Sequence, residues 1–391
     1  MPSNYKKLGS YIQVVNIRNT DDRKDNLLGL SVRKVFIKTI ANTIGTDFKT
    51  YKVVKKNQFT YIPDTSRRGD KIAIAILENE EDALVSQAYT VFEVIDEKKL
   101  LPEYLMMWFR RPEFDRYARF KSHGSAREIF DWAEMCDTEL PIPSPEKQKE
   151  IVREYNIIQN RIALNNQLIT KLEETAQAIY KHWFVDFEFP DDNGKPYKSN
   201  GGEMVWCAEL EKEIPEGWKI KRLEDIANLR YGKMLDSDLF LEKGYPVFSG
   251  YGVRGYYSEY MYEEPQILVL CRGVSGTGEV RLSPKFAYIT NLSIVVETNN
   301  IFSKLFLFYF LKNEDLKSLD SGSAQSMITT GDLYRHQILN PKDDVQKHFE
   351  NKIQAVLNAI ESTTKENQKL VELKDLLLAK MTKVETEKEL I

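Results

Sequence analysis

Histidine is the commonest general acid or base near neutral pH, and this chain of 391 residues has four of them. The histidines, at positions 123, 182, 336 and 348, lie in no HExxH pattern and near no GxSxG pattern. The run Gly273–Gly278 lacks the lysine of a phosphate-binding loop, so we interpret it as a turn between strands. No two prolines are adjacent, which excludes the Asp/Asn-Pro-Pro-aromatic segment of amino-methyltransferases. The sequence favours a chain without a catalytic site, although spacing alone leaves a nuclease carboxylate cluster open.

The three cysteines, Cys136, Cys207 and Cys271, are far apart and form no CxxC pair. Neither a disulfide framework nor a metal site is therefore predicted, and we expect a reduced, cytoplasmic protein. The longest apolar stretch, residues 301–311, is interrupted by Lys304 and is too short to cross a bilayer. Because 55 Lys and Arg face 59 Asp and Glu, the net charge is −4, and any surface that binds nucleic acid must be local.

One such surface is predicted within residues 1–76, which carry fifteen Lys and Arg against six Asp and Glu. Aromatic residues are interleaved with these cations, a mixture typical of surfaces that hold the phosphate backbone and approach the bases. The competing interpretation is a solvated domain face, which explains any single one of these residues at least as well. In this half of the chain we predict DNA contacts at Lys34, Arg67, Arg68 and Tyr89.

A second cluster covers residues 249–257, with the sequence Ser-Gly-Tyr-Gly-Val-Arg-Gly-Tyr-Tyr. Its glycines would let the backbone approach DNA while the arginine pairs with a guanine edge. The same glycines would equally form a tight hairpin. In this half of the chain we predict DNA contacts at Arg254, Tyr256, Arg272 and Thr277.

The sequence repeats itself at a spacing of about two hundred residues. At an offset of 198, residues 124–174 match residues 322–372 at eleven positions, whereas average residue usage gives about three by chance. The matches include the Gly-Ser-Ala at 124–126 and Gln148. The chain is therefore predicted to be an internal duplication, in which each half runs from a variable, strand-rich segment to one long helix.

Two long helices with matching hydrophobic patterns are predicted, one after Pro143 and one after Pro341. In both helices the apolar residues recur in steps of four and three, which is the seam of a coiled coil. Each seam becomes polar near its middle, which penalises slipped pairings, so we expect the two helices to pair with each other. The predicted seam residues are Ile151, Tyr155, Ile158, Ile162, Asn165, Ile169, Leu172, Ile179, Ile353, Val356, Ile360, Thr363, Asn367, Leu370 and Leu377.

Short strand patterns precede each long helix, which is the order of an α+β fold. They fall at residues 51–54, 59–62, 71–77 and 89–95 in the first half, and at 267–270, 279–282, 286–289 and 293–297 in the second half. A shorter helix follows them at 102–120 and at 303–319. The predicted segments are a globular domain at 1–143, a long helix at 144–186, a polar connector at 187–214, a second globular domain at 215–341 and a second long helix at 342–391.

The order of these segments resembles the specificity (S) subunit of type I restriction-modification enzymes over essentially the whole chain. The resemblance rests on short motifs that are weak alone and specific in combination. The second copy departs from the pattern, because residues 340–346 lack the paired prolines that precede the first long helix. The motifs are Leu140–Gln148 (LPIPSPEKQ), His182–Phe187 (HWFVDF), Pro215–Trp218 (PEGW), Gly29–Ile37, Tyr51–Val54 and the two Gly-Ser-Ala turns.

The resemblance implies two α+β target recognition domains, separated by two long helices that form an antiparallel intramolecular coiled coil with a pseudo-twofold repeat. Each domain would read half of a split double-stranded DNA target, and the helices would fix the gap. The S subunit itself is not catalytic and carries no cofactor. Two modification (M) subunits, which bind S-adenosylmethionine, would methylate adenine N6. Restriction (R) subunits would add translocation and cleavage, which need ATP and Mg.

Two other classes stay open from the sequence alone. A stand-alone nuclease that acts at a split site would show metal-dependent cleavage by the purified chain. A coiled-coil scaffold with two protein-binding domains would not bind DNA even with its partners present. An S subunit that has lost its M or R partners would have the same sequence features.

Overall fold

The computed structural model of the chain describes residues 5–39, 45–66, 69, 71–124, 128–273, 276–299, 302–320 and 326–383. Its contacts group into two compact units. Unit 1 comprises residues 1–166 and 364–391, and unit 2 comprises residues 167–363. Among the described residues, no helix is long and apolar enough to cross a membrane.

Unit 1 is built on an antiparallel sheet of four strands in the order β2 (Ile12–Val15), β10 (Thr90–Val94), β7 (Phe59–Tyr61) and β8 (Ile74–Ile76). Helix α1 (Pro102–Phe109) packs on this sheet, because Phe59 and Phe92 stack at 4.9 Å and Phe109 meets both rings edge-on. The smaller elements are β1 (Tyr5–Lys7) paired with β11 (Glu139–Pro141), the sheet of β3 (Ile17–Arg18), β6 (Lys52–Lys55) and β9 (Asp82–Val85), the hairpin of β4 (Leu28–Ser31) and β5 (Val35–Lys38), and helices α2 (Pro112–Phe120) and α3 (Trp132–Cys136).

Unit 2 repeats this plan. Its antiparallel sheet has the order β15 (Ala227–Tyr231), β21 (Ser293–Thr298), β18 (Ile267–Leu270) and β19 (Val280–Leu282), and helix α6 (Lys304–Asn313) packs against it. The pair β14 (Lys219–Arg222) and β22 (Gln337–Asn340) corresponds to β1 and β11. The remaining elements are β12 (Met204–Cys207), β13 (Lys212–Pro215), β16 (Tyr245–Phe248), β17 (Val253–Tyr257), β20 (Tyr288–Ile289), α5 (Leu223–Ile226) and α7 (Thr330–Tyr334).

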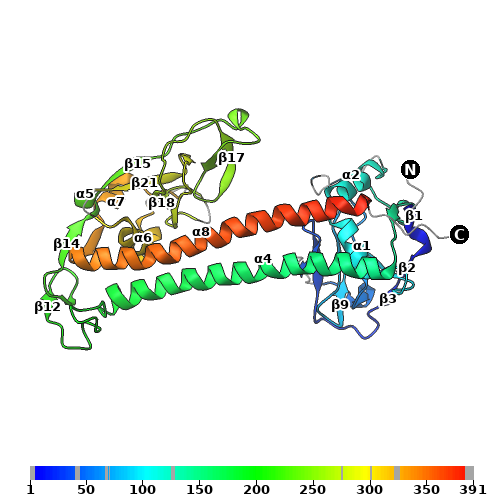
Figure 1. The fold of residues 1–391 in the computed structure, drawn as a ribbon, viewed down its shortest axis with the longest axis horizontal. Coiled ribbons are helices and arrows are strands. Elements are labelled where there is room, and N and C mark those ends of the chain that lie inside the picture. Colours follow the sequence, from blue (N-terminus) through cyan, green and yellow to red (C-terminus); the bar gives the residue numbers. More distant parts are fainter. Residues whose placement is uncertain are drawn as a thin grey trace. The chain divides into compact units, whose positions relative to one another are not determined.

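The two long helices, α4 (Pro145–Tyr180) and α8 (Asp343–Lys380), run side by side in opposite directions (Figure 1). In unit 1 the start of α4 shares a hydrophobic core with the end of α8, and in unit 2 the end of α4 shares a core with the start of α8. Every residue of the predicted seam is buried or half-buried. Asn165 is 3% exposed and donates a hydrogen bond to Asn367 at 3.0 Å, so the two asparagines of the seam pair with each other. The helices form the predicted antiparallel coiled coil.

A buried glutamine attaches the start of α4 to the sheet domain of unit 1. The side chain of Gln148 is 0% exposed, and its carbonyl oxygen accepts the amide N–H of Leu101 at 2.8 Å. Its amide nitrogen donates to the carbonyls of Lys99 and Pro143 at 2.8 and 2.9 Å. Both amide donors and the carbonyl oxygen of one side chain therefore hold the N-termini of α1 and α4 together.

Gln346 does the same in unit 2. Its carbonyl oxygen accepts the amide N–H of Ser303 before α6 at 3.3 Å, and its amide nitrogen donates to the carbonyl of Pro341 at 3.0 Å. The residue is 2% exposed. The second helix therefore starts as the first does although its paired prolines are missing, because the glutamine and not the second proline makes the connection.

Each predicted strand is observed, with shifts of a few residues, but other strands, such as β2 and β15, were not predicted. Both of the shorter predicted helices differ from the structure. The helix predicted at 102–120 is two helices, α1 and α2, which meet at Arg110 and Arg111. Pro112 explains the break, because proline disfavours helical backbone in the residue before it and cannot donate a helix hydrogen bond. The predicted helix at 303–319 ends at Asn313, and a separate turn of 3-10 helix covers 316–319.

Candidate DNA-recognition surfaces

In unit 1 the first candidate, Lys34, points into the protein. It lies in the turn of the β4–β5 hairpin with a φ of 64°, and its ammonium is 2.5 Å from the Asp115 carboxylate of α2. The residue is only 6% exposed, and burial lowers the pKa of Lys34 against the opposing effect of Asp115. Because the ammonium is buried and paired with Asp115, it has little surface left for a phosphate. The ion pair instead fixes the β4–β5 hairpin to α2.

The same hairpin exposes other cations that sequence reasoning did not select. Arg33, beside Lys34 in the turn, and Lys38, at the end of β5, are exposed and have no hydrogen bond or ion pair from their side chains within the described residues. Val35 and Ile37 between them are 44% and 38% exposed. Free cations next to exposed apolar side chains suit contact with phosphates and with the apolar edges of bases. The only sequence signal was the basic character of the segment, which Lys34 shares.

Of the other predicted DNA contacts in unit 1, the structure describes Tyr89 but not Arg67 and Arg68. Tyr89 is half-buried and packs against a small apolar cluster that includes Leu30 and Ile62, while its carbonyl accepts the Lys52 ammonium at 2.6 Å. Arg67 and Arg68 lie outside the described residues. DNA contact by these three residues stays a prediction.

In unit 2 the cluster at 249–257 forms a hairpin between β16 and β17. Arg254 and Tyr256 lie on β17 with exposed side chains, and Arg254 makes no hydrogen bond or ion pair within the described residues. Gly250 has a φ of +81°, and a Cβ there would come within 2.6 Å of the Ser293 hydroxyl. The hairpin interpretation of these glycines is confirmed, and the approach of this backbone to DNA stays a prediction.

Tyr251 connects this hairpin to the turn that carries Arg272. Its hydroxyl donates to the Arg272 carbonyl at 2.9 Å, and its ring lies over Gly273 and Gly276, where a Cβ would come within 2.1 and 2.5 Å of it. The exposed side chains of Arg254 and Arg272 are therefore on two neighbouring segments that one tyrosine ties together. Sequence reasoning did not select Tyr251, because nothing in the sequence indicates which turn its ring covers.

Thr277, the last candidate in this unit, is 6% exposed. Its hydroxyl donates to the Gly273 carbonyl at 2.7 Å and closes the turn. Thr277 shapes the segment that presents Arg272, and its own hydroxyl is already used.

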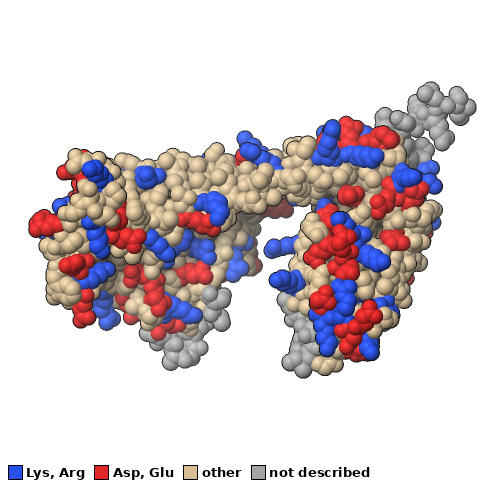
Figure 2. Space-filling view, turned by 90° about the horizontal axis from the view of Figure 1, so that it is seen from below, with Lys and Arg blue, Asp and Glu red and all other residues tan. Residues whose placement is uncertain are grey.

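The surface of unit 1 in Figure 2 carries Lys and Arg mixed with Asp and Glu, with no single broad basic face in that view. Several cations of the basic N-terminal segment are paired within the unit, such as Arg23 with Asp82 at 2.8 Å and Lys56 with Glu81 at 3.3 Å. Among the described residues there is no group of three or more His, Cys, Asp or Glu that could hold a metal ion. Part of the positive charge of the N-terminal segment is therefore neutralised within the unit, and its cations do not merge into one basic face in that view.

The duplicated domain also matches a known family. The family described as type I restriction modification DNA specificity domain matches residues 5–174 and again residues 215–372. The chain belongs to this family. The two matches include both sheet domains and most of both long helices, so each copy of the family domain corresponds to one half of the duplication.

Curated specificity subunits are similar over most of the chain. The type I restriction enzyme MjaIX specificity subunit of Methanocaldococcus jannaschii is 26% identical over 312 residues, which is 74% of this chain and 70% of that protein. The type I restriction enzyme HindI specificity subunit of Haemophilus influenzae is 22% identical over 415 residues, covering 88% and 89%. The crystal structure of a type I restriction-modification S subunit from M. genitalium has a TM-score of 0.56 at 16% identity, covering 98% of this chain and 96% of that one, and so shares the fold.

Proposed function

We propose that this chain reads a split DNA target, one half-site with each sheet domain, and directs adenine methylation and restriction by partner M and R subunits. The observation that carries the proposal is that the DNA specificity domain occurs twice, once for each sheet domain. A protein with two pseudo-equivalent recognition domains suits a target with two separated half-sites. The chain would work in the cytoplasm and would not be catalytic by itself.

Base reading in this proposal depends on the exposed cations. The cations selected for this role are Arg33 and Lys38 of the β4–β5 hairpin in unit 1 and Arg254 and Arg272 in unit 2, all of them exposed. Arginine donates two parallel hydrogen bonds to the O6 and N7 of guanine, and each such pair contributes about 1–3 kcal/mol of discrimination against the wrong base. Each domain would therefore specify its half-site with very few side chains.

The long helices offer a surface for the M subunits. Exposed apolar side chains recur on the outer side of both helices, away from the seam that joins them. Such patches on a charged surface are typical of protein interfaces. S-adenosylmethionine would be bound by the M subunits, and ATP and Mg by the R subunits. The exposed side chains are Ile157, Leu164 and Leu168 of α4 and Val371, Leu373 and Leu376 of α8.

The test is to express the chain together with the M subunit of its system in a host that lacks both, and to map N6-methyladenine across the genome. A split motif that appears only when this chain is present supports the proposal and gives both half-sites and the gap. If the complex assembles but no motif appears and DNA is not bound at any salt concentration, the scaffold alternative is favoured instead. Metal-dependent cleavage by the chain alone would favour a nuclease.

A further inference from the structure

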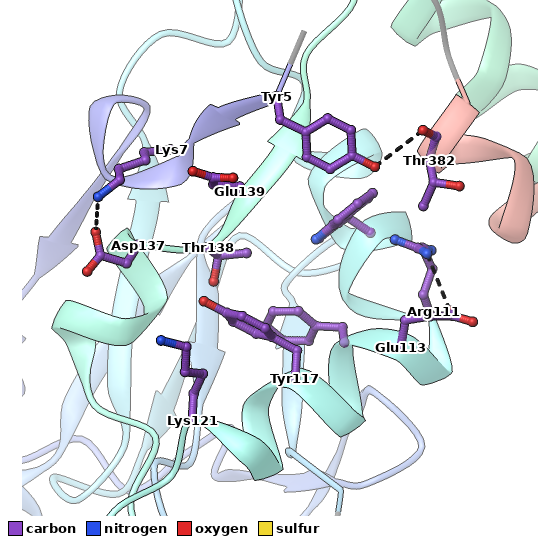
Figure 3. A pocket seen from close by; sticks show the side chains of 12 residues that line it. Tyr5, Lys7, Arg111, Glu113, Tyr117, Lys121, Asp137, Thr138, Glu139 and Thr382 are labelled. Carbon is purple, nitrogen blue, oxygen red and sulfur yellow. Dashed lines mark hydrogen bonds and ion pairs between the residues drawn. The ribbon is translucent and has the colours of Figure 1, made fainter. Parts of the chain in front are cut away.

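Unit 1 contains a pocket of about 570 Å³ that is separate from the exposed cations of the hairpin. Side chains from β1, β11, α1, α2 and the end of the described C-terminal segment line it (Figure 3). Four of the lining residues are aromatic: Tyr5, Trp108, Phe114 and Tyr117. Its volume is within the range of sites that hold small ligands or inserted side chains.

Arg111 lines this pocket and is only 4% exposed. The centre of its guanidinium lies 4.2 Å from the centroid of the Trp108 ring. Among the described residues of unit 1, Arg111 has one ion-pair partner, the half-exposed Glu113 at 3.4 Å, and its Nε is buried without a hydrogen-bond partner. Burial lowers the pKa of Arg111 against the opposing effect of Glu113.

A guanidinium has five N–H donors, and leaving them unused in a buried place is unfavourable. The two other cations that line the pocket are already paired: Lys7 with Asp137 at 2.7 Å, and Lys121 with Glu134 at 3.3 Å. Arg111 is therefore the lining cation, within the described part of the chain, whose donors remain available to an incoming group.

Unit 2 shows that the duplicated fold does not require this cation. The amides of Leu101 and Ser303 bond to the equivalent glutamines, and ten residues after each of them lie Arg111 and Asn313. Asn313 is neutral and satisfied, because its side chain accepts a hydrogen bond from Gln177 and donates one to the Tyr309 carbonyl. At this position unit 2 therefore has a neutral, hydrogen-bonded side chain in place of the buried cation of unit 1.

We propose that this pocket binds a carboxylate attached to an apolar or aromatic group, with Arg111 as the partner of the anion and the aromatic side chains as the walls. The planar guanidinium matches the two oxygens of a carboxylate. Stacking on Trp108 holds the guanidinium in place before the ligand arrives, which reduces the entropy lost on binding. Neither Arg33 nor Lys38 lines the pocket, so the ligand would not occupy the DNA contacts proposed above.

The test uses phenylacetate as the probe and its neutral analogue phenylacetamide as the matched control, titrated into the full chain by calorimetry. A probe of about ten non-hydrogen atoms is expected to bind with a Kd on the order of 1 mM. The amide, and the Arg111→Met variant with the acid, should each bind at least about tenfold more weakly, since the charge-assisted hydrogen bonds are lost. Circular dichroism checks that the variant is folded.

A second variant keeps the arginine and changes its neighbour. Glu113→Gln removes the carboxylate that pairs with Arg111 and would compete with the ligand, so phenylacetate should bind about threefold more tightly. Absence of phenylacetate binding to the native chain, equal binding of the acid and the amide, or weaker binding to Glu113→Gln would each overturn the proposal.

The same titration with the chain bound to its M subunit identifies the source of the carboxylate. Unchanged affinity in the complex indicates a free small acid as the natural ligand. Loss of probe binding in the complex, together with weaker assembly of the Arg111→Met variant, indicates a carboxylate of the partner protein.

Discussion

Replacing Gln148 by methionine removes three buried hydrogen bonds while nearly preserving the volume of the side chain. The N–H of Leu101 and the carbonyls of Lys99 and Pro143 would all lose their partner inside unit 1. One intramolecular hydrogen bond contributes about 1 kcal/mol net, and an orphaned buried group costs about 1–3 kcal/mol. We therefore expect Gln148→Met to lower the free energy of unfolding of unit 1 by about 2–4 kcal/mol.

The assay is native-state hydrogen exchange read by mass spectrometry, because it reports on each unit separately. Peptides that cover α1 and α2 should exchange faster in Gln148→Met, and peptides of unit 2 should not change. Gln346→Met should produce the mirror result, with a smaller effect because its hydrogen bonds are longer, at 3.0–3.3 Å. The control is Gln167→Met, an exposed glutamine of α4 that should change stability by less than about 0.5 kcal/mol.

Two results would refute this reasoning. If Gln148→Met is no more destabilising than Gln167→Met, the buried hydrogen bonds do not hold the start of α4 to the sheet domain. If exchange accelerates equally in both units, the glutamine acts on the whole chain and not on the junction where it lies.

Two further predictions concern DNA reading. Replacing Arg254 and Arg272 together by alanine should relax or change the half-site read by unit 2 in the methylation map, while the half-site read by unit 1 stays the same. A change in the other half-site instead would reverse the assignment of the two domains. Deleting the facing heptads Ile169–Thr175 and Leu357–Thr363 keeps the Asn165–Asn367 pair in the seam and shortens each helix by about 10 Å. The gap between the half-sites should then shrink by up to about three base pairs. An unchanged gap with both half-sites intact would show that the helices do not set the spacing.

The helices and their pairing were predictable because they depend on local periodicity. A seam that recurs every three and four residues is visible in the sequence, and its polar residues mark where two seams must match. The observed hydrogen bond between Asn165 and Asn367 meets that expectation. The sequence also predicted strands such as β18 at its observed bounds, since a short run of Ile, Leu and Val is a strong strand signal.

The candidate recognition residues were less predictable, because the sequence specifies a residue type and not the direction of its side chain. Lys34 and Arg33 are adjacent cations in one turn, yet the positive φ of Lys34 accompanies an inward side chain that pairs with Asp115. The hydroxyl of Thr277, another predicted contact, is used by the fold to close a turn. Tyr251 was missed, although it links the two segments that carry Arg254 and Arg272.

The sequence by itself determined the duplication, the two long helices, the α+β order of each half and the family. Strands follow from alternation every two residues, helices from apolar residues every three to four, and the duplication from a repeat at about two hundred residues. These patterns can be recognised without knowledge of any distant contact. Only the tertiary structure decided which cations lack an ion-pair partner and which turns contact each other. It also decided that Arg111 lines a pocket and has N–H donors without a partner. The physical reason is that pairing, burial and orientation depend on neighbours far away in the chain, as Lys34 depends on Asp115 across 81 residues.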